Sequence, residues 1–341
     1  MGLTQTSSSP AQPLRLATEV MLRVVLLVFH LSLVQGSVGD RLPVYKNTVR
    51  SCLNLECGSS AKLEEFSRNR QLHLSLLGWD CQSECQYKSM WKTVEHLNRD
   101  EKPIPQFHGK WPFIRVFGIQ EPASTVFSIG NGLAQVYFLR QLRRTVPHTV
   151  PMYYPGHFQC LVAINAWIWS TAFHARDLAW TEKLDYYCAY SIVLCSLVTS
   201  LVRVLAVRND SLDKRIIAGI AIVIGYVYCK HVYYLHYVHF DYAYNMRMNI
   251  TTAILSFIVW VLWSLWNIRR QPYLWKAIVC VVTINLCILL EVLDFPPVWW
   301  TFDAHSIWHA STIPITFLWT SFFMDDCLYL HNAREKLLKS V

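Results

Sequence analysis

AHSIWHASTIPITFLWTSFFM, residues 304–324, is the stretch that decides the fold of this chain. It is long enough to cross a bilayer as a helix, yet it carries His305 and His309 four residues apart. Ser170 and His174 show the same spacing in a second apolar stretch. Residues four apart lie on one face of a helix, and ionisable groups inside membrane segments are costly and usually functional. The pattern therefore predicts a metal or hydrolytic site inside a bundle of membrane helices.

The composition is that of a membrane protein. Of the 341 residues, 53% are hydrophobic and only 16% are charged, whereas about a quarter are charged in a typical soluble protein. The apolar residues lie in blocks of about 20, the length that spans a bilayer as a helix. Only helices or closed barrels satisfy their backbone groups in lipid. We therefore expect an all-α membrane protein, and we attribute the net charge of +8 to topology rather than to a nucleic-acid partner.

Seven apolar stretches are candidate membrane spans. They are 123–139, 158–175, 185–206, 216–236, 247–266, 273–293 and 304–324. Lysine and arginine follow the first, third, fifth and seventh stretches, whereas the loops 237–246 and 294–303 contain neither. The positive-inside rule then predicts a lumenal amino-terminal domain and a cytosolic tail, 325–341, on either side of a seven-helix domain, 123–324.

The amino-terminal region, 1–39, has the features of a signal peptide. A basic residue at Arg23 precedes a short apolar run, and small residues follow it, which favours cleavage near 36–39. Met21 is an alternative start, since the residues before it add nothing to this pattern. The rival interpretation, a first membrane anchor, is weaker because the apolar run is short.

Four cysteines mark residues 40–122 as a small disulfide-bonded lumenal domain. They are Cys52, Cys57, Cys81 and Cys85. An even number of cysteines behind a signal peptide is typical of a disulfide framework. Three pairings are possible, and the spacings suit nested bridges between two antiparallel helical segments, with the outer cysteines joined to each other and the inner ones likewise. A zinc site is the alternative for these thiols.

The predicted topology brings polar residues from separate segments to the lumenal face. They are Ser170 and His174 at the end of the second span, Asp185 at the start of the third, and Asp303, His305 and His309 at the start of the seventh. Three imidazoles with an open fourth position are the ligand set of a hydrolytic zinc site. Zinc there lowers the pKa of bound water to about 7 and supplies a nucleophile.

The remaining polar residues have supporting roles in this hypothesis. We expect Asp185 to orient the water or accept its proton, and Ser170 to hydrogen-bond the oxyanion. Holding the second nitrogen of a ligand imidazole is an alternative role for Asp185 or Asp303. Glu121 and Asn131, in or beside the first span, are candidates to support the site or a second ion, with packing or helix capping as the alternative.

Several stretches resemble a known family. They are PQFHGKWPF (105–113), EPAS (121–124), FHARDLAWTEKLDYYCA (173–189) and DFPPVWWTFDAHSIWHASTIP (294–314). These are similar to the Per-like family, in the superfamily of seven-helix hydrolases that includes alkaline ceramidases and adiponectin-type receptors. The resemblance runs from about Asp40 to the carboxyl end.

This resemblance implies remodelling of GPI-anchor lipids in the Golgi membrane. The implied reaction is phospholipase A2-type removal of the sn-2 acyl chain from GPI inositol phospholipid, with GPI-anchored proteins as substrates. The implied zinc ligands are His174, His305 and His309, with Ser170 and Asp185 as active-site partners. A ceramidase-like amidase and a non-enzymatic lipid receptor or cargo factor with a structural metal are the alternatives.

The chain departs from the family pattern at two cysteine positions. The pattern has cysteines where this chain has Thr48 and Ser89, the outermost positions of the nested scheme. We predict that the family's cysteines at these two positions are disulfide partners, since both are missing together in this chain. The remaining four cysteines can then still pair without a leftover thiol.

Overall fold

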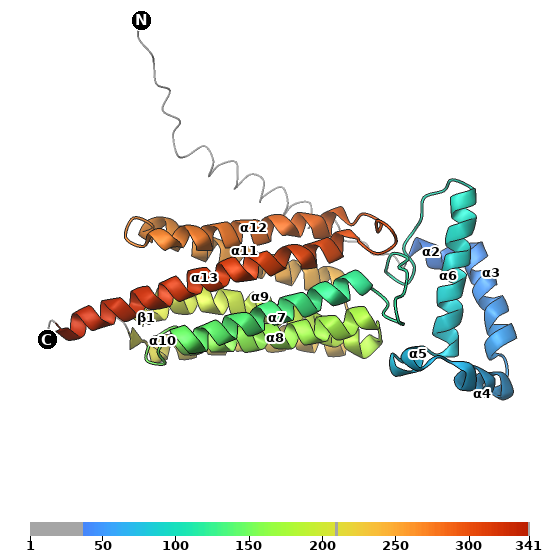
Figure 1. The fold of residues 1–341 in the computed structure, drawn as a ribbon, viewed down its shortest axis with the longest axis horizontal. Coiled ribbons are helices and arrows are strands. Elements are labelled where there is room, and N and C mark those ends of the chain that lie inside the picture. Colours follow the sequence, from blue (N-terminus) through green and yellow to red (C-terminus); the bar gives the residue numbers. More distant parts are fainter. Residues whose placement is uncertain (1–36, 209–210, 340–341) are drawn as a thin grey trace, which may run out of the picture.

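The fold is described from a computed structural model that places residues 37–208 and 211–339 (Figure 1). The region predicted to be a signal peptide, 1–39, therefore lies outside the described residues except for its last three positions. The described chain has two parts, a bundle of long helices and a smaller helical domain that lies across one end of it (Figure 1).

Seven long helices of the described chain coincide with the seven apolar stretches of the sequence. They are α7 (Pro122–Thr145), α8 (Tyr153–Ala175), α9 (Ala179–Leu201), α10 (Lys214–Tyr233), α11 (Tyr242–Asn267), α12 (Trp275–Leu293) and α13 (Ala304–Lys339). Short elements extend or join them: the π-helical turns Val202–Ala206 and Tyr234–Val238, the 3-10 turn Pro272–Leu274, and the two-residue strands β1 (Val207–Arg208) and β2 (Ser211–Leu212). Because α13 is continuous, the expected tail from residue 325 begins within a helix.

Four helical segments of the described chain are long and apolar enough to cross a membrane. They are Ala179–Ala206, Lys214–Val238, Tyr242–Asn267 and Pro272–Leu290. The helices α7 and α13 carry polar side chains that are buried inside the bundle. Ser128 and Asn131 of α7 and His309 of α13 are all buried. Polar side chains of α7 and α13 thus face the inside of the bundle.

The apolar core lies toward the end of the bundle that is remote from the smaller domain. Phe138 of α7, Trp260 of α11 and Phe322 of α13 are fully buried there and pack in one cluster. Arg203 and Asp326 form a buried bidentate ion pair at the same end, with nitrogen–oxygen distances of 2.7 and 2.8 Å. The opposite end of the bundle carries the polar residues of the candidate site.

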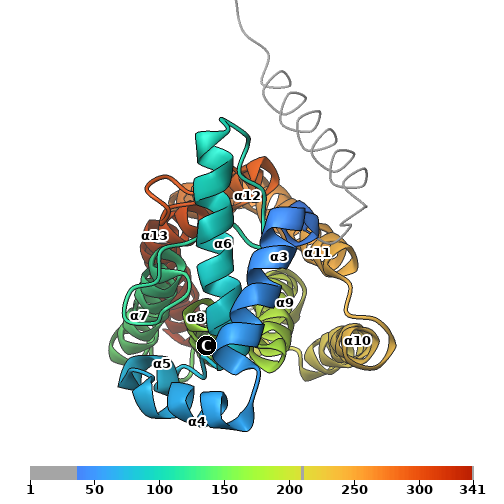
Figure 2. The same cartoon turned by 90° about the vertical axis from the view of Figure 1, so that its right-hand side faces the viewer.

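Five helices form the smaller domain. They are α2 (Val38–Arg41), α3 (Pro43–Cys52), α4 (Ser60–Asn69), α5 (Leu72–Leu76) and α6 (Cys81–Arg99), with a π-helical turn at Leu53–Cys57. Figure 2, which faces this domain, shows α3 and α6 lying across the bundle's end. Disulfides join Cys52 to Cys85 and Cys57 to Cys81. This is the nested pairing that the cysteine spacing favoured.

The smaller domain contacts both chain segments that lead into the candidate site. Trp79 donates its indole N–H to the carbonyl of Gly118 at 2.8 Å, just before α7 begins. The Trp111 indole donates to Asp294 at 2.8 Å in the loop before α13. Trp91 of α6 packs edge-on against Trp300 of that loop. The domain therefore fixes the starts of α7 and α13 relative to each other.

Candidate metal centre

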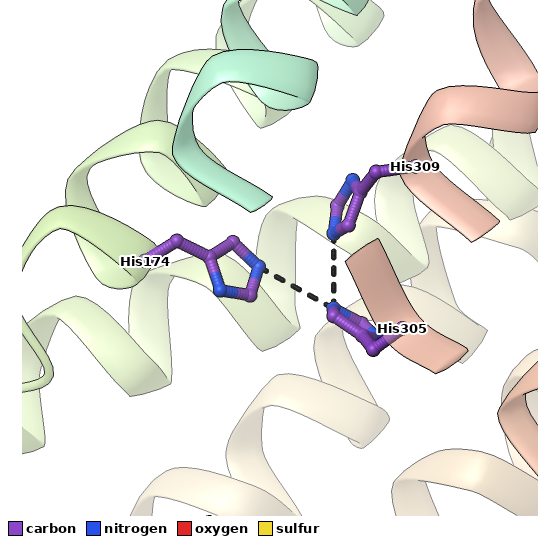
Figure 3. Close-up of side chains that lie close together, drawn as sticks. All are labelled: His174, His305 and His309. Carbon is purple, nitrogen blue, oxygen red and sulfur yellow. Dashed lines mark hydrogen bonds between the residues drawn. The ribbon is translucent and has the colours of Figure 1, made fainter. Parts of the chain in front are cut away.

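Three histidines from two helices converge at the end of the bundle beneath the smaller domain (Figure 3). His174 lies in the last turn of α8, and His305 and His309 lie in the first two turns of α13. Nε2 of His305 lies 3.4 Å from Nε2 of His174 and 2.9 Å from Nε2 of His309. His174 and His309 are buried, and His305 is half-buried. The structure thus brings together the three imidazoles that the sequence singled out.

The donor set of this cluster fits a metal ion. Each histidine can offer one nitrogen such that all three atoms lie within 4.8 Å of one another. Zinc binds imidazole nitrogens at about 2.0–2.1 Å in tetrahedral geometry, which separates neighbouring donor atoms by roughly 3.3 Å. Within the described residues, no carboxylate or thiol joins the three imidazoles at this distance. The cluster therefore offers three donor atoms that could hold a metal ion, the number of protein ligands found in hydrolytic zinc sites.

Glu121 fixes the tautomer of His174. Its Oε2 lies 2.8 Å from Nδ1 of the ring, so Nδ1 carries the proton and Nε2 presents a lone pair to the other histidines. Glu121 occupies the position before α7 but makes no capping hydrogen bond with its side chain. Of the two roles open to it in the sequence, the structure favours support of the histidine over capping. A carboxylate behind a ligand imidazole is a common feature of metal sites.

Lys110 stabilises the charge on Glu121. Its ammonium donates to Oε1 of Glu121, lies 3.1 Å from Asp177, and sits 3.9 Å from the ring centroid of Phe173. Burial acts to raise the pKa of Glu121, but the charges of Lys110 and His174 outweigh it and hold that pKa below the usual range of a carboxyl. Burial acts to lower the pKa of Lys110, and its two carboxylate partners raise it above its ordinary value.

A tight turn delivers Lys110 to the site. Residues Phe107 and Lys110 pair across the turn, with His108 and Gly109 at φ of 49° and 80°. Asp40 accepts hydrogen bonds from the backbone N–H of His108, which supports this left-handed conformation. Neither Lys110 nor Asp177 belongs to the polar pairs that the sequence pattern indicated as site residues. The only signal for them was that both lie in the family-like stretches.

Asn131 joins α7 to α13 beside His309. Its amide donates to the carbonyl of His309 at 2.8 Å and accepts from the hydroxyl of Thr312 at 2.9 Å. Gly130 allows the close approach of the two helices, because a Cβ there would lie 2.8 Å from Ile313. Asn131 therefore sets the position of a ligand helix and does not itself face an imidazole nitrogen in these contacts.

Asp303 caps the helix that carries two of the histidines. Its Oδ1 accepts from the backbone N–H of Ser306 at 2.8 Å, and its own carbonyl accepts from the hydroxyl of Ser306. Side-chain oxygens at this position satisfy the free N–H groups of a first helical turn. Asp303 thus orients the start of α13, and these contacts involve no imidazole.

Asp185 and Ser170 lie near the histidines in different ways. Asp185, in the second turn of α9, interacts electrostatically with His174 and His305 and is half-buried. Ser170 lies one turn before His174 on α8 and is buried. Its hydroxyl lies 3.1 Å from that of Ser128 on α7. If Ser128 donates in this pair, the proton of Ser170 is left for another acceptor.

The chain is similar to proteins named for GPI-anchor chemistry. The model of the Per1-like family matches residues 71–327. A zebrafish (Danio rerio) protein named GPI-specific phospholipase A2-like PGAP3 is 41% identical over 304 residues, which cover 89% of this chain and 95% of the relative. The human protein of the same name is 41% identical over 317 residues, 93% of this chain and 98% of the relative. A Drosophila melanogaster protein named post-GPI attachment to proteins factor 3 is 37% identical, covering 83% and 87%.

Proposed function

The chain belongs to the Per1-like family, and from this premise we propose that it removes the sn-2 acyl chain from the inositol phospholipid of GPI anchors. The names of its relatives support a role in GPI-anchor remodelling and an activity like that of a phospholipase A2. The observation that carries the proposal is the convergence of His174, His305 and His309, because three imidazoles are the ligand set of zinc hydrolases.

We place this site at the lumenal surface of the Golgi membrane. Four helices have the length and composition of membrane spans, and we propose that α7, α8 and α13 cross with them as a seven-helix domain. The distribution of lysine and arginine between alternate loops supports a lumenal smaller domain and a cytosolic carboxyl end. GPI lipids lie in the lumenal leaflet, so this orientation puts substrate and histidines on one side.

The reaction is hydrolysis of a carboxylic ester. Zinc bound by the three histidines would polarise the ester carbonyl and make water nucleophilic at neutral pH. The carboxylate of Asp185 interacts electrostatically with His174 and His305, and it would accept the proton of the attacking water and return it to the departing alcohol oxygen. The hydroxyl of Ser170 would donate a hydrogen bond to the oxyanion that develops on the carbonyl oxygen. The products are a free fatty acid and a lyso-GPI.

Lipid products and metal content test this proposal. Purified protein in vesicles that contain a GPI-anchored protein should release fatty acid from the sn-2 position, and vesicles that contain ceramide should yield no sphingosine. Sphingosine release without fatty-acid release would favour the ceramidase-like alternative.

A matched pair of variants tests the ligand assignment. The double variant His174→Ala/His305→Ala should lose bound zinc and fatty-acid release together, while His239→Ala, which changes an exposed histidine outside the cluster, should keep both. Equal zinc content in wild type and double variant would overturn the assignment. Zinc lost without any change in GPI-lipid processing would favour a structural metal.

A further inference from the structure

Exposed apolar side chains gather where the smaller domain meets the bundle. The most exposed are Leu72 (74%), Leu76 (77%), Phe117 (79%), Val298 (49%) and Trp299 (79%), which we call the junction patch. They lie on α5, on the turn 116–119 and on the turn 298–302. An apolar patch of this kind on a protein surface marks contact with another protein or with lipid.

The backbone holds the two aromatic residues of the patch in an unfavourable conformation. Phe117 and Trp299 have φ of 51° and 52°, in the left-handed region that bulky residues rarely adopt. Gly118 follows Phe117 and Trp300 follows Trp299, both also at positive φ. Local preference would select small or polar residues at such turn tips. An aromatic side chain that is almost fully exposed there therefore calls for an interaction outside the described chain.

The parts of the patch are tied together. The ring of Phe117 lies edge-on to His73 of α5, with centroids 6.5 Å apart. The N–H of Ile114 donates to the carbonyl of Trp300 at 3.0 Å, which links the segment before the first turn to the second turn. Ile114 itself is 45% exposed, between the two turns in this arrangement. These contacts connect α5 to the turn 116–119, and the segment before that turn to the turn 298–302.

The patch lies at the ends of the bundle helices. Backbone N–H groups of Gln120 and Glu121 donate to the last carbonyls of α8, so the turn 116–119 ends where α8 ends and α7 begins. Phe302, in the turn 298–302, packs against Phe127 near the start of α7. The outer face of α7 continues as an exposed apolar stripe of Val126, Ile129 and Leu133. The patch therefore adjoins the surface that faces lipid if α7 crosses the membrane.

We propose that the junction patch inserts into the lumenal leaflet, at the boundary between headgroups and acyl chains. The segments 71–79 and 295–302 contain no charged residue, whereas α4 carries several of both signs. Figure 1 shows α5 next to the end of the bundle and α4 farther from it. Aromatic and leucine side chains on an uncharged surface bind membrane interfaces. The partner is a phospholipid surface, and the inference rests on the bundle spanning the membrane, not on hydrolysis.

This attachment would fix the depth of the candidate site relative to the lumenal leaflet. The segment that carries Phe117 continues directly to Glu121, which holds His174. Anchoring Phe117 and Trp299 in the leaflet would therefore hold the chain segments that lead into α7 and α13, and with them the histidine cluster, at the depth of the lipid ester bonds.

Photocrosslinking in a defined bilayer tests the proposal. The full chain is reconstituted in phosphatidylcholine nanodiscs with p-benzoylphenylalanine at position 117 or 299, which keeps an aromatic ring at each site. Positions 55 and 63 are matched controls, because Leu55 and Leu63 are exposed apolar residues (68% and 45%) on the turn Leu53–Cys57 and on α4, and α4 lies farther from the bundle than α5 (Figure 1). Lipid adducts measured by mass spectrometry should be at least fivefold more frequent at 117 and 299 than at 55 and 63.

Two outcomes would overturn the proposal. Equal lipid adducts at all four positions would mean that the patch does not enter the leaflet. Adducts at 117 and 299 to a second copy of the chain would make the patch a protein interface. A second measurement is amide exchange of α5 in the nanodisc. Exchange should rise in Phe117→Asn/Trp299→Asn, where asparagine tolerates the left-handed backbone, and stay unchanged in Leu55→Asn.

Discussion

Lys110 reaches His174 through a single shared carboxylate, that of Glu121. The ammonium binds one oxygen of the carboxylate, and Nδ1 of the imidazole lies 2.8 Å from the other. The three residues come from a turn beneath the disulfide-bonded domain, from the start of α7 and from the end of α8. The smaller domain therefore takes part in the geometry of the histidine cluster and is not merely attached to the bundle.

Removing the charge of Lys110 should weaken metal binding. In Lys110→Met, Glu121 keeps its contact with His174 but loses the cation that neutralises it, so the imidazole is held less firmly. Loss of such supporting contacts typically costs 10–100-fold in metal affinity. Zinc competition titrations on the purified protein measure the effect. Lys102→Met, which changes an exposed lysine paired with Asp100, is the control and should bind zinc as wild type does. Unchanged affinity in Lys110→Met would refute this role.

Asp185→Asn should separate catalysis from metal binding. The amide fills the same space but cannot accept a proton, so we expect fatty-acid release to fall by about 10²–10⁴-fold. Zinc content should not change, because Asp185 is not one of the residues of the histidine cluster that could hold the ion. Asp325→Asn, which changes a carboxylate paired with Lys276 on α12, is the control for loss of a charge. A turnover rate within twofold of wild type would exclude Asp185 as the proton acceptor.

Ser170→Ala should slow turnover without loss of metal. Deletion of one hydrogen-bond donor to an oxyanion typically lowers the rate by about 10²–10³-fold. Ser196→Ala is a closely matched control, because Ser196 makes a similar hydroxyl contact with Ser256, 3.0 Å between α9 and α11. The comparison is made on initial rates of fatty-acid release at saturating substrate. Equal rates in the two variants would assign Ser170 to packing alone.

The elements that follow from local pattern could be predicted from the sequence. Apolar blocks of about 20 residues located the seven helices, because a block of that length forms one helix whose surface needs an apolar environment. The spacing of four residues put His305 and His309 on one face of a helix. The spacings of five and four residues within the two cysteine pairs favoured the nested pairing in which Cys52 is joined to Cys85. In each case the information lies within a few turns of one or two helices.

The contacts that connect distant segments could not be predicted in this way. The role of Lys110 depends on a turn with positive φ at His108, where nothing in the sequence before Gly109 demands that conformation. Arg176 stacks on Trp79 of the smaller domain, with its guanidinium 3.8 Å from the ring centroid, although 97 positions separate them by number (176 − 79). Such contacts depend on how two domains pack, which neither periodicity nor spacing specifies.

A third disulfide should form when cysteines replace Thr48 and Ser89. The helices α3 and α6 are antiparallel and are joined by Cys52–Cys85, so positions four residues before and after this pair lie on the next turn of the same interface. Ser89 is buried, and its hydroxyl has no hydrogen-bond partner among the described residues, so a thiol there displaces no contact. Because Cys52–Cys85 already joins the two helices, the new bridge closes a loop of about 10 residues, which should stabilise the domain by about 2–3 kcal/mol in the chain-entropy model. Peptide mapping of Thr48→Cys/Ser89→Cys under non-reducing conditions should find the two new cysteines joined, and amide exchange of α6 should slow.

The single variant Ser89→Cys is the control and should show neither the new bridge nor the slower exchange. A new cysteine joined instead to Cys52 or Cys85 would show that the register of α3 against α6 differs from the one described.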